Sequence, residues 1–304
     1  MSDTQEKLPP RGRTGYVALL GRPNTGKSTF LNTVLGCHIA AVSSKPQTTR
    51  KSMLGIYNDA DSQVIFLDAP GVHSNHLAID EAMSDSVKRT LEDADILLCL
   101  IDPTRIPGDE DNMAAELAAA SGKPVLMVLN KCDVSTQEQR DCSLKFYRER
   151  LPEAEAMLLT ATRLSSCTSL MEKVKSMLPE DLFLYERDAV TTAYERDIAA
   201  ELIRESLLEK LQEELPHCIA VTIDTWKSTP EEIQIRATLN LEREAHKGMV
   251  IGHGGRMLKA IRKDATARIS ELCGGAHVIL SLFVKVVPNW RKHKQFLKEI
   301  KLWE

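Results

Sequence analysis

Eight residues near the start of the sequence have the types and spacing of a loop that binds phosphate groups. They run Gly21-Arg22-Pro23-Asn24-Thr25-Gly26-Lys27-Ser28, with four residues between the two glycines and then lysine and serine. Glycines let backbone N–H groups face a polyphosphate, the lysine neutralises its outer phosphates, and the serine hydroxyl ligates Mg²⁺. The pattern predicts a nucleoside-polyphosphate site with Mg²⁺, formed by Arg22, Pro23, Asn24, Thr25, Gly26, Lys27, Ser28 and Thr29.

Two further motifs follow apolar runs that have the composition of buried strands. Asp68-Ala69-Pro70-Gly71 comes after the run 63–67, and Asn130-Lys131-Cys132-Asp133 comes after the run 124–129. Asp68 can hold Mg²⁺ through water, and the N–H of Gly71 can bond the γ-phosphate. Asp133 can accept hydrogen bonds from N1–H and the 2-amino group of guanine, which adenine lacks. The residues predicted to bind nucleotide here are Asp68, Ala69, Pro70, Gly71, Asn130, Lys131 and Asp133.

A third segment, Thr160-Ala161-Thr162, follows the run 156–159 and could close over the base. Each motif alone is weak, because a free Asn-Lys-x-Asp is usually a surface turn. All of them in this order, each after a strand, predict a guanine-nucleotide domain. The arrangement resembles the translation-factor-related class of GTPases over about residues 14–178.

The segment Lys45-Pro46-Gln47-Thr48-Thr49-Arg50 resembles the first switch loop of such a GTPase. A threonine there could join Ser28 on Mg²⁺ when GTP is bound, and loss of the γ-phosphate would release the loop. We favour Thr49 over Thr48, and two threonines in a plain loop are the alternative reading. The residues predicted to act in catalysis are Lys27, Thr49 and Gly71.

The residue after Gly71 is Val72, where many GTPases carry a glutamine that orients the attacking water. Valine cannot do so, and the sequence resembles GTPases with a hydrophobic residue there. In some of these, an asparagine at the position of Asn24 helps to bind K⁺. The resemblance implies slow hydrolysis accelerated by K⁺ or a partner. His73 is a weaker candidate base, since an exposed loop histidine is more often simply solvated.

The first half alternates strand-like and helix-like segments that must position these motifs. Apolar runs occur at 16–20, 53–58, 63–67, 95–101, 124–129 and 156–159, and helical stretches at 29–35, 78–91, 109–120 and 136–150. Alternation of this kind predicts an α/β domain with a mixed, mostly parallel sheet, in which 53–58 and 63–67 form an antiparallel hairpin. Functional residues then lie at the carboxyl ends of the strands.

The second half has a different pattern, with a helix at 194–215, strands at 217–226 and 233–241, and a final strand at 277–287. Between them, Gly252-His253-Gly254-Gly255 leads into a helix, and a second helix follows at 264–272. A Gly-x-x-Gly loop before a basic helix is the signature of KH modules, in which glycines allow a nucleic-acid backbone to approach. The order of elements is that of the type II (prokaryotic) KH domain. The residues predicted to bind RNA are Ile251, Gly252, His253, Gly254, Gly255, Arg256, Lys259, Arg262 and Lys263.

Charge and composition limit the class of protein. The 304 residues carry a net charge of −4, yet residues 243–301 contain 13 Lys or Arg against 4 Asp or Glu. This local basic surface favours an anionic partner for the second half, with a solvated face as the alternative. The seven cysteines form no Cys-x-x-Cys pair, which indicates a reduced, cytoplasmic chain. We expect a disordered leader at 1–13, the GTPase domain at 14–178, a linker at 179–193 and the KH domain with a C-terminal helix at 194–304.

A guanine-nucleotide domain followed by a prokaryotic KH domain resembles the Era family. The specific marks are Gly21-Arg22-Pro23-Asn24, Lys45-Pro46-Gln47-Thr48-Thr49-Arg50, Glu201-x-Ile203-Arg204-Glu205, Glu214-Leu215-Pro216 and Val284-Lys285-Val286. The resemblance implies GTP and GDP as ligands, Mg²⁺, and binding to small-subunit ribosomal RNA near its 3′ end during small-subunit assembly. It also implies peripheral association with the inner membrane. Nothing in the sequence demands more than a monomer.

Two alternatives stay open at this stage. The chain could be a tRNA-modification or other ribosome-assembly GTPase, which a C-terminal element other than KH would favour. It could also be a constitutive RNA-binding assembly protein with an attenuated nucleotide site. The family usually has Ser-Ala-Lys where Thr160-Ala161-Thr162 stands, and this departure supports the last alternative.

Overall fold

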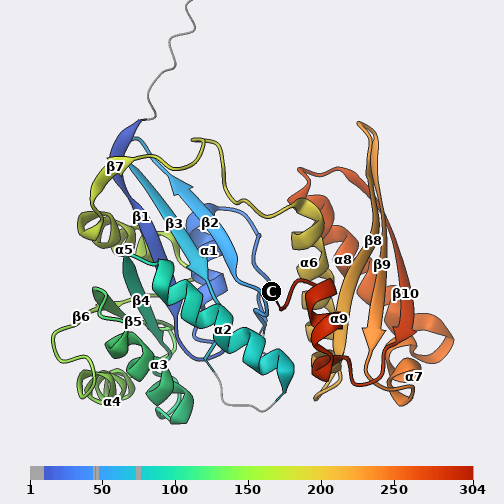
Figure 1. Ribbon diagram of the computed structural model, residues 1–304, viewed down its shortest axis with the longest axis horizontal. Helices are drawn as coiled ribbons and strands as arrows, with labels where there is room; N and C mark the ends of the chain where they lie inside the picture. The colour runs from blue at the N-terminus through green and yellow to red at the C-terminus, as the bar shows by residue number, and fades with distance from the viewer. Residues whose placement is uncertain (1–9, 44, 46–47, 73–76, 304) are drawn as a thin grey trace, which may run out of the picture.

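The computed structural model describes residues 10–43, 45, 48–72 and 77–303, and forms two domains side by side (Figure 1). Most of the expected leader, the positions 46 and 47 of the expected switch loop, and His73 lie outside these residues. Figure 1 shows the C-terminal segment lying between the two domains.

The first domain contains a sheet with the strand order β2-β3-β1-β4-β5-β6, to which β7 adds through β1. Its strands are β1 (Arg11–Leu20), β2 (Met53–Asn58), β3 (Ser62–Asp68), β4 (Ile96–Ile101), β5 (Val125–Leu129), β6 (Glu155–Leu158) and β7 (Glu180–Leu182). Strands β3, β1, β4, β5 and β6 run parallel, whereas β2 is antiparallel to β3. The predicted mixed, mostly parallel sheet with its hairpin is therefore confirmed.

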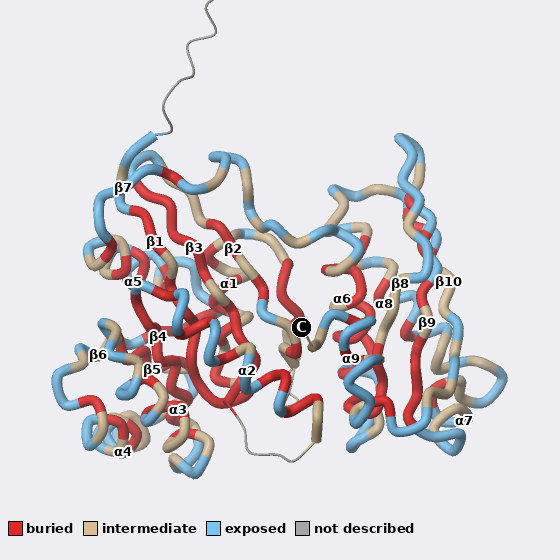
Figure 2. Tube along the Cα trace, in the orientation of Figure 1, coloured by how far each residue is buried: buried red, intermediate tan, exposed pale blue. Residues whose placement is uncertain are grey.

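Helices cover both faces of this sheet because successive residues of its central strands point to opposite faces and are apolar on both. The helices are α1 (Lys27–Leu35), α2 (Ala78–Asp93), α3 (Asp109–Ala120), α4 (Gln137–Arg148) and α5 (Leu164–Met177). Val17 and Leu19 of β1 face the core shared with α1 and α5, and Ala18 and Leu20 face the core shared with α2, α3 and α4. Figure 2 shows these central strands buried along most of their length. The carboxyl ends of β1, β3 and β5 are thereby fixed at one edge of the sheet.

The second domain begins with α6 (Glu195–Lys210) and contains a three-stranded sheet in the order β10-β9-β8. Its other elements are β8 (Ile219–Ser228), β9 (Glu232–Leu241), α7 (Ala245–Ile251), α8 (Arg256–Leu272), β10 (His277–Val286) and α9 (Lys294–Glu299). Strand β9 pairs antiparallel with β8 and parallel with β10. Residues such as Leu207 of α6 and Ile261 of α8 pack with Leu239 of the sheet in one core. The predicted type II KH order of helix, strand, strand, helix, helix, strand is confirmed.

The division of the two middle helices differs from the expectation. The sequence predicted both helices after the Gly-x-x-Gly loop, but α7 precedes the loop and α8 is one continuous helix. Asp264, the expected start of the second helix, lies inside α8, where its carboxylate accepts hydrogen bonds from Arg268 (3.0 Å) and Ser206 (2.8 Å). The Asp264 carboxylate thus accepts hydrogen bonds from side chains within and beside the helix, and does not cap a helix N-terminus as an aspartate often does.

Two expected boundaries also differ. Arg11–Arg13, assigned to the leader, belong to β1 and pair with β7 inside the expected linker. The segment is polar, so its backbone pairing rather than an apolar pattern makes it a strand, with Arg13 also donating to the carbonyl of Leu178 at 2.8 Å. Helix α6 ends at Lys210 rather than residue 215, and Glu213 has a φ of 51° in the turn that follows.

Candidate functional site

The predicted phosphate loop joins β1 to α1 and folds around its own lysine. Lys27 is buried, and its Nζ donates to the carbonyls of Gly21 and Arg22 at 3.0 Å each. Burial lowers the pKa of Lys27 to about 8, although the nearby charge of Asp68 opposes this shift. A buried ammonium held among carbonyls is a site for a phosphate oxygen, which would restore the charged form.

The tight course of the loop requires glycine at Gly26. This residue has a φ of 98°, and a Cβ there would lie 2.2 Å from the side-chain nitrogen of Asn130. Asn24 also has a positive φ, of 64°. The loop with these two positive φ values leads directly into the N-terminus of α1, and a loop of this kind can bind an anion through its backbone N–H groups.

The side chain of Arg22 faces away from the predicted nucleotide position. It is buried, its Nη2 lies 3.2 Å from Asp102 and its Nε lies 3.2 Å from Asp111. Tyr147 donates to the same Asp111 oxygen at 2.9 Å. Arg22 can therefore contact nucleotide through its backbone, while its guanidinium fixes the loop to the rest of the domain. Thr25 is also buried, and its hydroxyl donates to the carbonyl of Arg22 at 3.2 Å.

Three predicted magnesium ligands converge beside the loop. The Oγ of Ser28 lies 3.0 Å from the Oγ1 of Thr49 and 2.8 Å from the Oδ2 of Asp68. Among the described residues, the buried Oδ1 of Asp68 has no hydrogen-bond partner. Burial raises the pKa of Asp68 to about 6, against the opposing charge of Lys27. Two hydroxyls and a carboxylate, one of its oxygens unsatisfied, fit the all-oxygen ligand preference of Mg²⁺.

Thr48 does not share this position. Its hydroxyl donates to the carbonyl of Lys45 at 2.6 Å, so it faces its own loop. A small cavity of about 40 Å³ is lined by parts of the phosphate loop and by Thr48, Thr49 and Gly71. Gly71 contacts the loop so closely that a Cβ would lie 2.6 Å from the backbone nitrogen of Pro23. Ala69, before it, and Val72, after it, are both buried.

The base-side motifs meet through Asn130, which is buried at the end of β5. Its Nδ2 donates to the carbonyl of Thr25 at 2.7 Å, and its Oδ1 accepts from the N–H of Ala161 at 2.9 Å. Asn130 thus ties the phosphate loop to the 160–162 segment. The N–H of Thr160 donates to Ser166 at 2.9 Å, which holds that segment from its other side.

The two charged residues of the Asn-Lys-x-Asp motif lie toward solvent. The Nζ of Lys131 lies 2.7 Å from Asp102, and the side chain of Asp133 is exposed. The structural roles of Asp102 and Asp111 were missed from the sequence. Asp102 follows β4 directly, so its place at the carboxyl end of a strand was the available signal.

The Gly-x-x-Gly loop lies at the surface between α7 and α8. Gly252, Gly254 and Gly255 have φ values of 72°, 59° and 74°, and a Cβ on Gly254 would meet no described atom within 4 Å. The predicted RNA residues His253, Arg256, Lys259, Arg262 and Lys263 are exposed, and Ile251 is half-buried. An open backbone, a helix start and exposed basic side chains can together bind a sugar-phosphate chain.

Other basic residues near this region have acidic partners. Arg268 lies 2.5 Å from Glu205 and 2.7 Å from Glu209, and Arg291 lies 2.5 Å from Glu242. Carboxylates of the same domain therefore neutralise both arginines. Within the described parts of the chain, no group of three His, Cys, Asp or Glu side chains could hold a metal. No described helix is long and apolar enough to cross a membrane.

Comparison with known proteins matches both halves. Residues 16–131 match the family model described as 50S ribosome-binding GTPase, and residues 214–291 match the KH domain model. A structure of Era from Aquifex aeolicus bound to GDP and AlF4⁻ is 32% identical, with a TM-score of 0.90, over 96% of this chain and 100% of that one. Era in complex with MgGDPNP and nucleotides 1506–1542 of 16S ribosomal RNA gives the same values. On this similarity along almost its whole length, the chain belongs to the Era family.

Proposed function

We propose that the protein is a GTP-binding and GTP-hydrolysing switch that binds small-subunit ribosomal RNA near its 3′ end and assists small-subunit assembly. The observation that carries the proposal is the convergence of Ser28, Thr49 and Asp68 beside Lys27, in a chain that also presents an open Gly-x-x-Gly loop. The solved complex of Era with MgGDPNP and 16S ribosomal RNA nucleotides supports both halves of the proposal.

The residues of the first domain would act mainly by positioning and charge. Lys27 and the loop N–H groups bind the phosphates, while Ser28 and Thr49, with Asp68 through water, hold Mg²⁺. The ion supplies charge neutralisation on the β- and γ-phosphate oxygens when it is bound. Gly71 can place its N–H at the γ-phosphate because no side chain separates it from the phosphate loop.

Slow hydrolysis follows from the residue after Gly71. Val72 is buried and offers no polar atom to orient the attacking water. We include K⁺, bound with help from Asn24, as an accelerating ion in the proposal, and a partner as the other source of acceleration. The position of Asn24 in the loop and its positive φ support a contact with the phosphates or an ion beside them.

Selection of guanine rests on Asp133. Its carboxylate is exposed and can accept hydrogen bonds from N1–H and the 2-amino group of guanine, which supports this role. The contacts of Asn130 and Ser166 hold the 160–162 segment in place without the lysine usual in the family. These contacts favour an active nucleotide site over the alternative of a constitutive RNA-binding protein with an attenuated one.

The RNA half of the proposal rests on the α7–α8 loop. Backbone groups of Gly252–Gly255 and the exposed Arg256, Lys259 and Arg262 would contact phosphates, which position the strand without reading its sequence. We further propose that the protein acts in the cytoplasm as a monomer with peripheral inner-membrane association. Family resemblance supports this last part, and flotation with vesicles of inner-membrane lipids tests it.

Purified protein assayed for Mg²⁺-dependent GTP turnover and for binding of a 16S 3′-end RNA tests the proposal. We expect slow conversion of GTP to GDP and phosphate and no turnover of ATP. We also expect tighter binding of this RNA than of an unrelated RNA of equal length. Equal turnover of GTP and ATP would contradict the nucleotide half, and equal affinity for both RNAs would contradict the RNA half.

A further inference from the structure

Two buried arginines cross between the domains on either side of Thr49. Arg50, from the first domain, donates through Nη2 to the carbonyl of His217 (2.7 Å) and through Nη1 to that of Ile219 (2.9 Å). Arg204, from α6 of the second domain, donates to the carbonyl of Thr48. Both side chains are at most 4% exposed. The residues before and after Thr49 are thus each fixed to the other domain.

Each arginine is itself held in place. The guanidinium of Arg50 lies over the ring of Trp290, 5.6 Å from its centroid, and the Trp290 Nε1 donates to the carbonyl of Cys218 at 3.0 Å. The Nε of Arg204 donates to Glu201 at 2.9 Å. Burial alone would raise the pKa of Glu201, yet the charges of Arg204, Lys51 and Arg50 hold that pKa below its ordinary value. Charged hydrogen bonds in such surroundings are among the stronger ones in proteins.

The segment that these arginines hold has no regular structure of its own. Residues 48–50 form neither helix nor strand, so contacts with other parts of the molecule must fix their backbone. The hydroxyl of Thr49 lies 3.0 Å from Ser28 at the magnesium position. The backbone of Thr49 is therefore oriented by the second domain, while its hydroxyl lies beside Ser28 at the proposed magnesium position.

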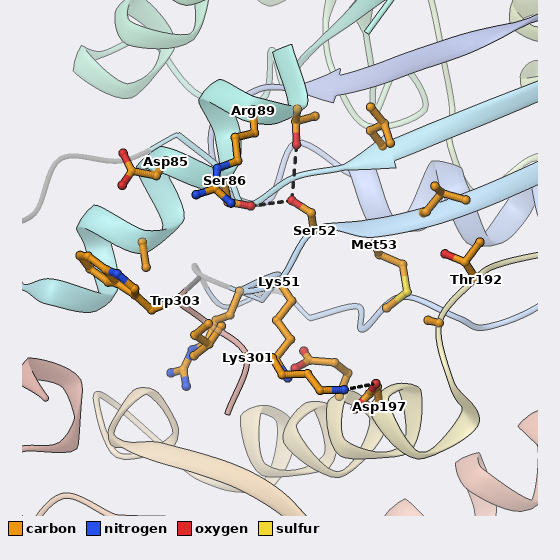
Figure 3. A pocket seen from close by; sticks show the side chains of 18 of the residues that line it. Lys51, Ser52, Met53, Asp85, Ser86, Arg89, Thr192, Asp197, Lys301 and Trp303 are labelled. Atoms are coloured by element: carbon orange, nitrogen blue, oxygen red, sulfur yellow. Dashed lines mark hydrogen bonds and ion pairs between the residues drawn. The ribbon is translucent and has the colours of Figure 1, made fainter. Parts of the chain in front are cut away.

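Beside Arg50, the two domains separate rather than pack continuously. A pocket of about 580 Å³ opens there between the start of β2, α2, α6 and the C-terminal segment (Figure 3). Lys51, Ser52 and Arg89 line it from the first domain, and Asp197 and Lys301 from the second, with Lys301 and Asp197 paired at 3.0 Å. The arginine contacts thus lie at the edge of an open cavity, where a shift of one domain would meet little packing.

We propose that Arg50 and Arg204 form an arginine clamp that holds Thr49 at the magnesium position, so that the KH domain completes the GTP-bound form of the nucleotide site. The Glu201-x-Ile203-Arg204-Glu205 motif and the last residue of Lys45–Arg50 thereby receive a role. Arg204 is a positioning residue that acts through Thr49. The inference rests on the proposed function, in which Thr49 binds Mg²⁺ with GTP and not with GDP.

A second contact between the domains does not involve Arg204, so we expect the domains to stay docked when this arginine is replaced. Ile79 and Met83 of α2 pack with Leu297 and Ile300 of the C-terminal segment in a separate apolar cluster. This cluster is independent of Arg204, so Arg204→Ala tests the position of residues 48–50 rather than loss of the interface. Arg196→Ala is the matched control, because Arg196 lies on the same helix with its side chain exposed.

The test measures affinity of the full chain for a non-hydrolysable GTP analogue and for GDP, both with Mg²⁺. Arg204→Ala should weaken the analogue about 10-fold, because loss of one charged hydrogen bond lowers the population of the competent loop. Affinity for GDP should change by less than about 2-fold, since GDP does not need Thr49. Arg204→Lys should recover part of the loss, and Arg196→Ala should match wild type.

A double-mutant cycle separates positioning from general damage. In a Thr49→Ala background, Arg204→Ala should cause no further loss of analogue affinity, because its effect passes through Thr49. Equal loss for GDP and the analogue, or additive losses in the cycle, would overturn the clamp. If instead wild type bound the GTP analogue no differently with and without Mg²⁺, the proposed function would fail as well.

Discussion

The amide of Asn130 offers a quantitative test of how the nucleotide site is built. This buried side chain joins the phosphate loop, through the carbonyl of Thr25, to the base-side segment, through the N–H of Ala161, at 2.7 and 2.9 Å. Asn130→Ala would remove both hydrogen bonds and leave two backbone groups without their partner. The two loops would then no longer be held in one arrangement before nucleotide binds.

The cost follows from those two groups. A buried polar group that loses its partner costs about 1–3 kcal/mol, and water from the open site can replace part of each bond, which places the cost at the low end. We therefore expect about 2 kcal/mol in total, which corresponds to about 30-fold weaker GDP binding. The substitution leaves Lys27, Ser28 and Asp133 unchanged, so the loss would report on loop position.

Titration calorimetry with GDP and Mg²⁺ measures this loss directly. Asn112→Ala is the control, because Asn112 lies on α3 and its amide donates to Glu116 on the same helix, at 2.7 Å. We expect the control to bind GDP as wild type does. GDP affinity of Asn130→Ala within about 3-fold of wild type, less than 1 kcal/mol, would refute the role assigned to the amide.

Three further predictions concern base choice, pH and ions. Asp133→Asn should shift preference from guanine to xanthine nucleotides, measured by competition, because an amide can donate to the 2-oxygen of xanthine; unchanged guanine preference would exclude Asp133 as the base contact. Burial, with the charges of Arg50 and Arg204, lowers the pKa of His217 to about 4, so the folded protein keeps this imidazole neutral while the unfolded chain protonates. The free energy of unfolding should therefore fall by about 2 kcal/mol from this group between pH 7 and pH 5. Urea unfolding of His217→Asn should show a smaller fall over the same pH range than wild type. An equal fall in both proteins would count against the lowered pKa. GTP turnover should be faster in K⁺ than in Na⁺, and Asn24→Ala should remove the difference, whereas equally rapid wild-type turnover in both salts would argue against K⁺.

Much of the nucleotide site could be predicted from the sequence because its motifs are local. Glycine spacing, and an acidic or amide residue directly after an apolar run, report a strand end and the loop that follows it. The pleated alternation of Val17 to Leu20 then places these ends at one edge. The mostly parallel sheet and the hairpin of 53–58 with 63–67 are confirmed, whereas the order of the strands was not predicted.

The contacts that were missed join residues far apart in the chain. Arg22 has the charge and position of a phosphate-binding residue, but two carboxylates neutralise its guanidinium. They belong to Asp102, directly after β4, and Asp111 of α3. Arg268 reads as a surface charge on a helix, yet Glu205 on α6 pairs with it. The amino-acid sequence shows which residues are charged, but the partners of these residues depend on how elements far apart in the chain pack together.

The most direct test of the central claim is crosslinking of the protein to RNA in its own cells, for wild type and Gly254→Asp. Aspartate tolerates the φ of 59° at this position, and its Cβ would meet no described atom within 4 Å, so the domain should fold. The new carboxylate would repel the phosphate chain. We predict that wild-type crosslinks gather near the 3′ end of small-subunit ribosomal RNA and disappear in Gly254→Asp. Diffuse crosslinks, or the same map for both proteins, would contradict the account.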